Sequence, residues 1–465
     1  MLRINELLEA TGGKLINRLE GKDIKGISID SRSIKPQEAF IAIKGTNFDG
    51  HDFIHEAVKK GAGAVIVHGS QFPPQADQPT AGTVHSEKRV SVIRVKDTTK
   101  ALGDIARFWR KKFLHIPVIA VTGSNGKTTT KEMVGCLLSK KFRVLKNEGT
   151  KNNHIGLPMA LLGLNNSHDI VVLEIGTNHF GEVDYLTRIC RPNIGIITNI
   201  GPSHLEYLRN LERVFREKYS LIENLEKPCV AILNADDALL RKKVLSRVQK
   251  PFIIGFSLKK QSDFRALDIQ SIGRSLRFSI QGKYRFTLKT LGYYNVYNAL
   301  SAIITARLFG IAYNDIAPLL ADFNFPPGRL KFIEIKSIRF IDDTYNSNPL
   351  SLKQALDALK SFKAKGRKIF VMGDMLELGS RADTFHYQAG EEAAKCCDIF
   401  ITAGKLSRAA ARAARDSGLN KKNIFISESA VCARDILYKR VSLNRDDIVL
   451  VKGSRSMKME EVFKA

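Results

Sequence analysis

Near-continuous apolar runs of strand length, separated by segments with helical periodicity, are the feature that most constrains the fold of this chain. Five such runs lie at 117–121, 169–176, 193–200, 229–234 and 251–256. Strands that are apolar along their whole length are typical of a parallel sheet that helices cover on both faces. Residues 262–290 instead alternate polar and apolar side chains, which predicts a small antiparallel section. The sequence therefore predicts an α/β fold with a mostly parallel sheet.

The same alternation begins again after "FPPGRL" (325–330), whose Pro and Gly residues are typical of a linker. Residues 1–113 mix short strands and helices around a polar, Pro-rich loop at 70–83. A chain of 465 residues is too long for a single hydrophobic core. We therefore predict three domains: a small N-terminal α/β domain at 1–113, a central P-loop-type domain with a mostly parallel sheet at 114–324, and a C-terminal Rossmann-like doubly wound sheet at 325–465.

The net charge of +26 is compatible with nucleic acid, an anionic membrane surface or small anionic substrates. No basic run is longer than three residues, and no aromatic residues are interleaved with the basic ones for base stacking. No window approaches the ~18–20 consecutive apolar residues that cross a bilayer. The six cysteines form no CxxC pair and are typical of reduced thiols in the cytoplasm. We therefore expect a cytoplasmic, monomeric protein with small-molecule substrates, no nucleic-acid partner and no membrane span.

The stretch "VTGSNGKTTT" (121–130) joins an apolar strand to a helix through a glycine-containing turn. Glycines let such a turn wrap around phosphate oxygens, while the first amides of the helix face the anion. Lys127 would neutralise the terminal phosphates, and the Thr128 hydroxyl would bind Mg²⁺. The predicted ATP loop consists of Gly123, Ser124, Asn125, Gly126, Lys127, Thr128 and Thr129. The spacing is a shortened form of the general P-loop pattern, and a glycine-rich turn without phosphate chemistry is the alternative.

Two polar residues follow neighbouring apolar runs: Glu174 ends "DIVVLE", and His204 stands in "TNIGPSHLE". In an open parallel sheet, the carboxyl ends of the strands border the crevice where ligands bind. Both side chains are therefore candidates for a metal or phosphate site, while a solvated strand cap and an ordinary packing histidine are the alternatives. Lys218 lies in a predicted helix at 211–225, where periodicity alone favours a lysine that extends to the surface.

Further polar residues collect near the start of the predicted helix 295–311 and around the linker. Asn295 and Asn298 would contact a base or a ribose, although helix capping explains Asn295 equally well. Arg329 in the linker would reach a phosphate. The loop that follows the strand "RFIDD" contains Asp342, Asp343, Tyr345, Asn346 and Asn348. Such a density of polar groups predicts a binding site, although Asn-Pro followed by Ser also suits a turn and a helix cap.

Taken together, these motifs resemble those of the Mur ligases over the whole chain. "IAVTGSNGKTTTKEM" is similar to the ATP loop of that family, "LEIGTNHFGE" to its metal-binding glutamate strand and "TNIGPSHLE" to the segment of its histidine. "NEGTKNNHIGLP" resembles the segment that contacts the muramoyl substrate, and "SIDSRSIKPQEAFIAIKG" with "FDGHDF" resembles the domain that receives the uridine diphosphate. "DDTYNSNPLS", "VMGDMLELG" and "VKGSRSMKME" resemble the branch that adds D-alanyl-D-alanine.

The resemblance implies an ATP-dependent, ADP-forming ligase of peptidoglycan precursor synthesis. It would join D-alanyl-D-alanine to the C-terminal carboxylate of UDP-MurNAc-tripeptide through an acyl phosphate, the last cytoplasmic step of that synthesis. ATP would be the co-substrate and Mg²⁺ the metal. Lys218 aligns with a lysine that family members carry as a carbamate, which would help to hold a second Mg²⁺. Near two metal ions an ammonium is disfavoured, so the neutral amine that reacts with CO₂ becomes accessible.

The resemblance also implies roles for individual residues. The implied catalytic residues are Lys127, Glu174, His204, Lys218 and Arg329. The implied metal ligands are Thr128, Glu174, His204 and Lys218. Beyond the loop, the implied ATP contacts are Asn295, Asn298, Arg329 and Asp343. The implied substrate contacts are Ser31, Arg32, Lys44, Asn152 and Asn153, together with Tyr345, Asn346 and Asn348 of the C-terminal domain, which would bind D-alanyl-D-alanine and complete the nucleotide site.

Two alternatives remain open at this point. The first is another amide ligase of the same superfamily, either one that adds a single amino acid or a folylpolyglutamate synthetase. "DDTYNSNP" and the uridine-nucleotide domain argue against it. The second is a nucleic-acid-dependent P-loop ATPase, which the net charge permits. The absence of basic clusters and the combination of Glu174, His204 and Lys218 disfavour it.

Overall fold

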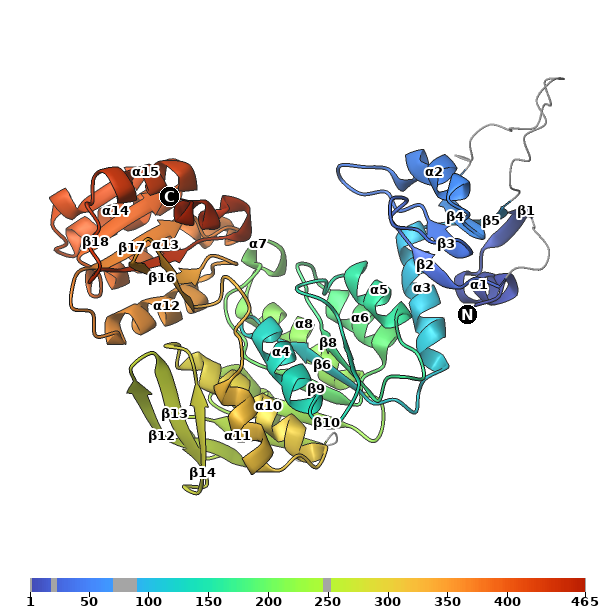
Figure 1. Ribbon diagram of the computed structural model, residues 1–465, viewed down its shortest axis with the longest axis horizontal. Helices are drawn as coiled ribbons and strands as arrows, with labels where there is room; N and C mark the ends of the chain where they lie inside the picture. The colour runs from blue at the N-terminus through green and yellow to red at the C-terminus, as the bar shows by residue number, and fades with distance from the viewer. Residues whose placement is uncertain (1, 18–22, 70–89, 246–251, 465) are drawn as a thin grey trace. The chain divides into compact units, whose positions relative to one another are not determined.

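The computed structural model describes residues 2–17, 23–69, 90–245 and 252–464 (Figure 1). The predicted loop at 70–83 lies outside the described residues. Contacts between Cα atoms divide the chain into two compact units, and each is described by itself. The first unit consists of Met1–Val118, Leu145–Ile175 and Tyr185–Pro192, and the second of Ile119–Val144, Gly176–Asp184 and Asn193–Ala465. The boundaries of the three predicted domains stay a prediction.

The first sheet has five strands in the order β1-β5-β4-β3-β2. Its strands are β1 (Lys14–Asn17), β2 (Gly26–Ser28), β3 (Glu38–Ile41), β4 (Ala64–His68) and β5 (Ser91–Val95). Neighbouring strands are parallel except for the antiparallel pair of β1 and β5. The helices of this region are α1 (Ile4–Thr11), α2 (Ile54–Lys59) and α3 (Thr98–Lys111). Leu102 and Ile105 of α3 are buried in one cluster with Ile66 and Ile93, so α3 covers one face of the sheet.

The second sheet has nine strands in the order β14-β13-β12-β11-β10-β9-β6-β8-β7. Its strands are β6 (Val118–Thr122), β7 (Val144–Lys146), β8 (Ile170–Glu174), β9 (Ile194–Ile197), β10 (Val230–Asn234), β11 (Phe252–Ser257), β12 (Phe264–Ile272), β13 (Ser275–Ile280) and β14 (Tyr284–Leu288). The pairs from β6 through β9, β10 and β11 to β12 are parallel, whereas β12, β13 and β14 pair antiparallel. The parallel sheet and the antiparallel section predicted for 262–290 are both confirmed.

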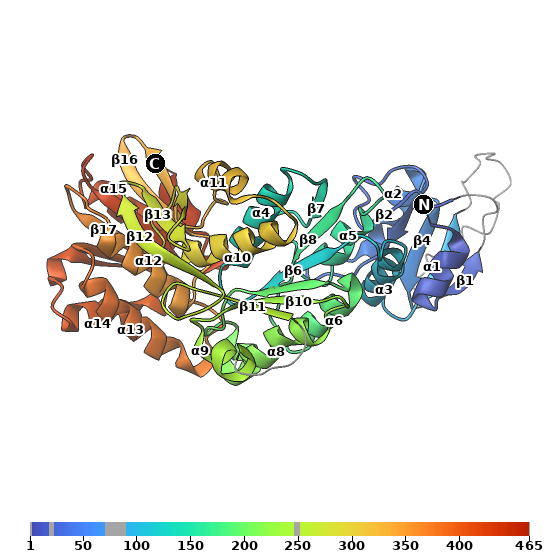
Figure 2. The ribbon, with the colours of Figure 1, turned by 90° about the horizontal axis from the view of Figure 1, so that it is seen from below.

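The helices of this central region follow the strands in the predicted alternation. They are α4 (Lys127–Leu138), α5 (Gly156–Leu162), α6 (Glu182–Cys190), α7 (Leu205–Leu208), α8 (Leu211–Glu223), α9 (Ala238–Leu240), α10 (Tyr294–Leu308) and α11 (Tyr313–Ala321). Helix α10 packs against α4, the helix that follows the glycine turn, in both views of the ribbon (Figures 1 and 2). Helix α8 begins where the Asn210 side chain accepts a hydrogen bond from the Arg213 amide, a typical N-cap.

The third sheet has six strands in the order β15-β16-β20-β17-β18-β19. Its strands are β15 (Lys331–Ile335), β16 (Ile338–Asp343), β17 (Lys368–Gly373), β18 (Ile399–Ala403), β19 (Ile424–Ser427) and β20 (Ile448–Lys452). All its neighbouring strands are parallel except β15 and β16. Its helices are α12 (Pro349–Ser361), α13 (Ala382–Ala394), α14 (Ser407–Asp416) and α15 (Ala430–Lys439). Figure 2 shows α15 on one face of the sheet and α13 with α14 on the other.

These three sheets confirm the predicted α/β fold class, including the doubly wound C-terminal sheet. Several of the apolar runs are fully buried strands, as expected where helices cover both faces of a sheet: every residue of β6, β8, β18 and β20 is buried, whereas β11 begins with the exposed Phe252. None of the helices in the described ranges is long and apolar enough to cross a membrane.

Candidate active site

The glycine turn between β6 and α4 leaves no room for side chains at two positions. Gly123 has a φ of +145° and Gly126 a φ of +84°, conformations that residues with a Cβ rarely adopt. A Cβ on Gly123 would lie 1.9 Å from Thr198 Oγ1, and one on Gly126 would lie 2.4 Å from Asn298 Oδ1. The turn therefore lies directly against the end of β9 and against α10.

The segment that follows β9 holds this turn in place. Ser124 Oγ donates to the Gly201 carbonyl at 2.8 Å and accepts from the Gly201 amide at 2.9 Å. The Asn125 amide donates to Asn199 Oδ1 at 3.0 Å, and Thr198 Oγ1 donates to the Asn125 carbonyl at 2.5 Å. Because the side chains of the turn are used as anchors, its backbone geometry is set before any anion binds.

One of the predicted phosphate residues, Thr128, contacts the linker arginine in the second unit. Lys127 Nζ donates to the Gly123 carbonyl at 2.9 Å. Thr128 Oγ1 accepts a hydrogen bond from Arg329 Nη2 at 2.8 Å. The Arg329 guanidinium lies 4.1 Å from the centre of the Tyr345 ring, a distance typical of a cation–π contact. Four residues that the sequence singled out from distant segments therefore lie together.

A second link joins the glycine turn to the polar loop after β16. Asn125 Nδ2 donates to Asn348 Oδ1 at 3.2 Å, and Asn348 Nδ2 donates to Asn125 Oδ1 at 2.8 Å. Asn348 Oδ1 also accepts from the Ser351 amide at 2.9 Å and caps α12. The Asn348 side chain therefore both caps α12, which was the predicted alternative, and contacts the glycine turn.

The Asp343 side chain and the Asn346 backbone carbonyl both contact Lys452 of β20. Asp343 Oδ2 lies 2.6 Å from Lys452 Nζ, and Asp343 Oδ1 accepts from the Leu330 amide at 3.1 Å. Lys452 Nζ also donates to the Asn346 carbonyl at 2.9 Å. Burial raises the pKa of Asp343, and the charge of Lys452 opposes this. These contacts connect the linker to β16 and β20, while the ligand contacts of Asp343 and Asn346 stay predictions.

Asn295 and Asn298 form a buried chain of amides along α10. Asn295 Nδ2 donates to Thr290 Oγ1 at 3.0 Å, and Asn298 Nδ2 donates to Asn295 Oδ1 at 3.0 Å. Thr130 Oγ1 of α4 then donates to Asn298 Oδ1 at 3.2 Å. Asn295 is not the N-cap of α10, since that position is Tyr293, so the capping alternative is wrong. Their contacts with ATP stay predictions.

Lys218 is a buried lysine of α8, with only 1% of its surface exposed. Burial and the charge of Lys127 together lower the pKa of Lys218 to about 7, while the charge of Glu217 opposes them. The alternative of a lysine that extends to the surface is therefore wrong. Near neutral pH a large share of Lys218 is the neutral amine, the form that reacts with CO₂.

His204 contacts a residue that the sequence analysis did not single out. His204 Nδ1 lies 2.5 Å from Glu377 Oε2, although the two residues are 173 positions apart. Burial lowers the pKa of His204 and the charges of Lys218 and Lys127 act in the same direction, whereas the hydrogen bond with Glu377 opposes them. The hydrogen bond from His204 holds the pKa of Glu377 below its usual value. Glu377 stands in "VMGDMLELG", a loop at the carboxyl edge of the third sheet, and that position was the available signal.

Glu174 ends β8 in the first unit and is 1% exposed. Its Oε1 accepts from Asn152 Nδ2 at 2.6 Å, and its backbone amide donates to Asn147 Oδ1 at 2.9 Å. Its Oε2 is buried and has no hydrogen-bond partner. The solvated-cap alternative is therefore wrong. A buried carboxylate oxygen without a donor fits a hard divalent cation such as Mg²⁺, which binds oxygen ligands.

Within the described residues, no group of three or more His, Cys, Asp or Glu side chains could by itself hold a metal ion. The metal set that the resemblance implies differs from such a group, because Thr128 supplies a hydroxyl and Lys218 would supply a carbamate oxygen. The buried Oε2 of Glu174 is an oxygen donor of the kind that Mg²⁺ prefers, and His204 would add one nitrogen donor to these oxygens. The donor types present therefore fit Mg²⁺.

The predicted substrate residues of the first unit differ in their exposure. Arg32 and Lys44 have side chains that are 84% and 66% exposed, with ion pairs to Asp30 and Asp49 at 2.8 and 3.7 Å. Ser31 is buried and donates to Glu56 Oε2 at 2.8 Å.

Asn153, a further predicted substrate residue, accepts from the Gly156 amide at 2.8 Å at the start of α5. In contrast to Ser31, Asn153 is exposed, and both basic residues expose most of their side chains.

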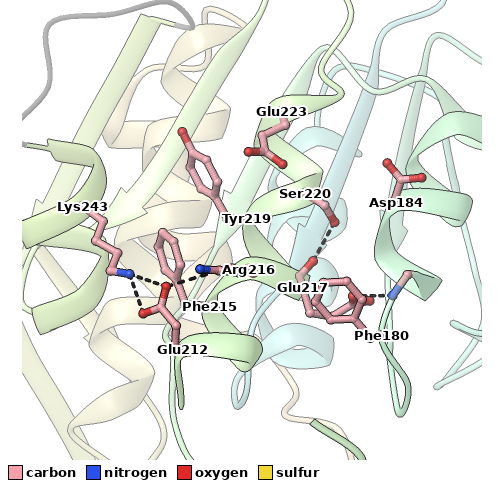
Figure 3. A pocket seen from close by; sticks show the side chains of 11 residues that line it. Phe180, Asp184, Glu212, Phe215, Arg216, Glu217, Tyr219, Ser220, Glu223 and Lys243 are labelled. Carbon is pink, nitrogen blue, oxygen red and sulfur yellow. Dashed lines mark hydrogen bonds and ion pairs between the residues drawn. The ribbon is translucent and has the colours of Figure 1, made fainter. Parts of the chain in front are cut away.

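A pocket of about 610 Å³ lies along one side of α8 (Figure 3). None of the predicted site residues lines it. Its wall includes Glu217, whose carboxylate accepts from the Gly181 amide at 2.6 Å, the Val183 amide at 2.8 Å and Thr177 Oγ1 at 3.2 Å. Glu217 therefore connects the helix of Lys218 to the loop at 177–183, a role that no sequence pattern indicated.

Three family models match the chain. Residues 121–306 match the Mur ligase middle domain, residues 328–455 match the Mur ligase, glutamate ligase domain, and residues 23–110 match the catalytic domain of the Mur ligase family. The matches follow the order of the three sheets. They contain the glycine turn, Arg329 and the loop of Asn348.

The chain is also similar to named proteins over nearly its full length. The UDP-N-acetylmuramoyl-tripeptide–D-alanyl-D-alanine ligase of Bacillus subtilis is 34% identical over 99% of this chain and 97% of the relative. The crystal structure of MurF from Acinetobacter baumannii has a TM-score of 0.86 and 30% identity, covering 100% of this chain and 98% of that one. MurF from Thermotoga maritima in complex with ADP has a TM-score of 0.79 and 28% identity, covering 95% and 96%. The chain belongs to the Mur ligase family.

Proposed function

We propose that this protein is an ATP-dependent, ADP-forming ligase that joins D-alanyl-D-alanine to the C-terminal carboxylate of UDP-MurNAc-tripeptide. The observation that carries this proposal is the 34% identity, over nearly the whole of both chains, to a relative named for that reaction. The meeting of Lys127, Thr128, Arg329 and Asn348 around the glycine turn is consistent with it, because ligation needs a nucleotide site and an acceptor site side by side.

The reaction proceeds in two steps. A carboxylate oxygen of the tripeptide attacks the γ-phosphorus of ATP, the bond between that phosphorus and the bridging oxygen breaks, and ADP leaves. The amine of D-alanyl-D-alanine then attacks the carbonyl carbon of the acyl phosphate and loses a proton. The tetrahedral intermediate expels inorganic phosphate and leaves the amide. Phosphorylation is needed because a free carboxylate is a poor electrophile.

The first step brings two anions together, so positive groups must offset their repulsion. Lys127, at the start of α4, would neutralise the terminal phosphates of ATP. Arg329, held at Thr128 and over Tyr345, would stabilise the phosphoryl group in transfer. The amides at the N-terminus of α4 would bind the remaining phosphate oxygens.

Mg²⁺ would be held by Thr128, Glu174, His204 and a carbamate on Lys218. When bound, it would compensate the charge that develops on the transferring phosphoryl group. The carbamate would form when the neutral amine of Lys218 attacks CO₂ and loses a proton, so that a cation becomes an anion. The lowered pKa of Lys218 supports this step, because the amine is available near pH 7.

We also propose the three domains 1–113, 114–324 and 325–465 as functional units. The first would receive the UDP-sugar, the second ATP, and the third D-alanyl-D-alanine. The protein would act as a monomer in the cytoplasm, where ATP and UDP-sugars are available. Gel filtration with light scattering tests the monomer, and a mass of twice 51.8 kDa would contradict it.

Phosphate release from ATP, with each acceptor omitted in turn, tests the reaction. We expect release only when both UDP-MurNAc-tripeptide and D-alanyl-D-alanine are present. Glutamate or diaminopimelate in place of D-alanyl-D-alanine tests the other amide ligases, and DNA or RNA tests a nucleic-acid-dependent ATPase. Release that depends on a nucleic acid and ignores the UDP-sugar would overturn the proposal.

Substitution of Lys218 tests the carbamate. We expect Lys218→Ala to lose most of the activity, with partial recovery when a short carboxylate such as formate or acetate is added, because the anion occupies the place of the carbamate. The wild type with the same salt is the control. An unimpaired Lys218→Ala variant would remove the carbamate from the mechanism.

A further inference from the structure

Glu377 and His204 are joined by more than one contact. The ring nitrogen Nδ1 of His204 lies 2.5 Å from Glu377 Oε2, and the Glu377 carbonyl accepts from the Glu206 amide at 3.1 Å. Both residues have left-handed backbone conformations, with φ of 51° for His204 and 60° for Glu377. Non-glycine residues hold this conformation where the surrounding structure imposes it. The pair is therefore built in a defined geometry.

Each partner of the pair is fixed from its own side. On the side of His204, Ser203 Oγ donates to Ser124 Oγ at 3.1 Å, so the histidine loop is tied to the glycine turn. On the side of Glu377, the Leu376 amide donates to Ser454 Oγ at 2.9 Å, and the Met375 amide donates to His386 Nε2 at 2.9 Å. The carboxylate thus comes from a loop that belongs to the third sheet.

An ionised carboxylate only accepts hydrogen bonds, so the contact places a proton on Nδ1 of His204. In the neutral ring the other nitrogen, Nε2, then carries the lone pair. Histidines that bind metals commonly donate their second ring nitrogen to a carboxylate, which sets the tautomer and the orientation of the ring.

We propose that Glu377 is a positioning residue that holds His204 as the Nδ1–H tautomer and so presents Nε2 as its ligand atom. The inference rests on the proposed function for the use of that atom, and it assigns to the C-terminal part of the chain a role in preparing the metal site.

The first experiment locates the ring proton and needs no substrate. Long-range ¹H–¹⁵N correlation spectra of ¹⁵N-histidine-labelled protein, at a pH where the ring is neutral, report which nitrogen carries the proton. The His204 signal is the one absent from a His204→Asn variant. We expect Nδ1–H in the wild type and a shift toward the Nε2–H form in Glu377→Ala. The matched control is Glu206→Gln, an exposed carboxylate two residues from His204.

The second experiment measures the affinity for Mn²⁺ by electron paramagnetic resonance in the presence of ADP. We expect Glu377→Ala to weaken Mn²⁺ binding by about 10–100-fold and Glu206→Gln to leave it unchanged. Glu377→Gln keeps an acceptor but loses the charge, so we expect the wild-type tautomer with an intermediate affinity.

If Glu377→Ala does not fold, Glu377→Gln decides the question, and a wild-type affinity in that variant overturns the inference. Where Glu377→Ala folds, retention of Nδ1–H or an unchanged Mn²⁺ affinity overturns it. The two proposals can fail separately. If the wild type shows no ligase activity but the tautomer still changes in Glu377→Ala, the proposed function is overturned and the positioning role stands.

Discussion

At the scale of single residues, Lys218 shows how surroundings change the chemistry of a side chain. Its place on a helix with one apolar side gave no sign of burial, because lysines on such helices normally reach solvent. The structure encloses it and puts Lys127 close enough to disfavour a second positive charge. A residue type that is usually a solvated cation is thereby partly neutral near pH 7, the form that the proposed carbamate requires.

This burial has a consequence for stability that Lys218→Met measures. The pKa of Lys218 is about 7 in the folded protein and near the ordinary 10.5 when unfolded. Between these values the unfolded chain binds the additional proton, so the free energy of unfolding of the wild type rises as the pH increases from 7 toward 10. We expect the stability advantage of Lys218→Met over the wild type to be largest at pH 7 and to shrink at higher pH.

Urea unfolding at pH 7 and pH 9.5 in CO₂-free buffer measures this difference. The control is Lys140→Met, at an exposed lysine of the same chain. Parallel curves of unfolding free energy against pH for Lys218→Met and the wild type would contradict the buried, weakly protonated lysine.

At the scale of elements, the glycine turn was predictable because its chemistry is local: strand, glycines, lysine and threonine are consecutive in the sequence. Its neighbours were not predictable. Thr198, directly after β9, and Asn298 of α10 lie against Gly123 and Gly126, although both are remote from the turn in the sequence. The sequence predicts Asn295 and Asn298 as nucleotide contacts. In the structure, a buried chain of hydrogen bonds runs from Asn295 through Asn298 to Thr130 of α4.

Gly126→Ala and Gly273→Ala separate the backbone cost from the steric cost. Gly273, in the turn between β12 and β13, has a φ of +61° and open space around it, whereas a Cβ at Gly126 meets Asn298 Oδ1 at 2.4 Å. We expect Gly273→Ala to lower the free energy of unfolding by about 1–2 kcal/mol without affecting ATP binding. Gly126→Ala should cost more and also weaken ATP binding.

Urea unfolding and calorimetric titration with ATP measure the two effects. Equal losses of stability in both variants, with unchanged ATP affinity, would show that the close approach at Gly126 has no role.

At the scale of the second unit as a whole, three links join the central region to the C-terminal region: Arg329 with Thr128, Asn125 with Asn348, and His204 with Glu377. Each link joins residues more than 170 positions apart. Hydrogen bonds between polar side chains can break and form again when a ligand binds, so the two regions could close around it. Such closure suits a reaction whose acyl phosphate must be kept from water.

Substitutions of Asn348 test whether such a link serves the nucleotide. Serine caps a helix about as well as asparagine, but it is too short to pair with Asn125. We therefore expect Asn348→Ser to keep a near-wild-type Tm while the KM for ATP rises several-fold. Asn348→Ala should show the same KM effect and also lose about 1 kcal/mol of stability with the cap. An unchanged KM in Asn348→Ser would show that the pair with Asn125 is only structural.

The sequence by itself determined the order and type of the elements, the parallel and antiparallel parts of the sheets, and the glycine turn between β6 and α4. These follow from periodicity and from short motifs, which act between residues close in the chain. Only the tertiary structure decided that Lys218 is buried, that Asn348 reaches Asn125 and that Glu377 holds His204. Those properties depend on contacts between distant segments, and no local pattern of side chains encodes which of many polar residues will meet.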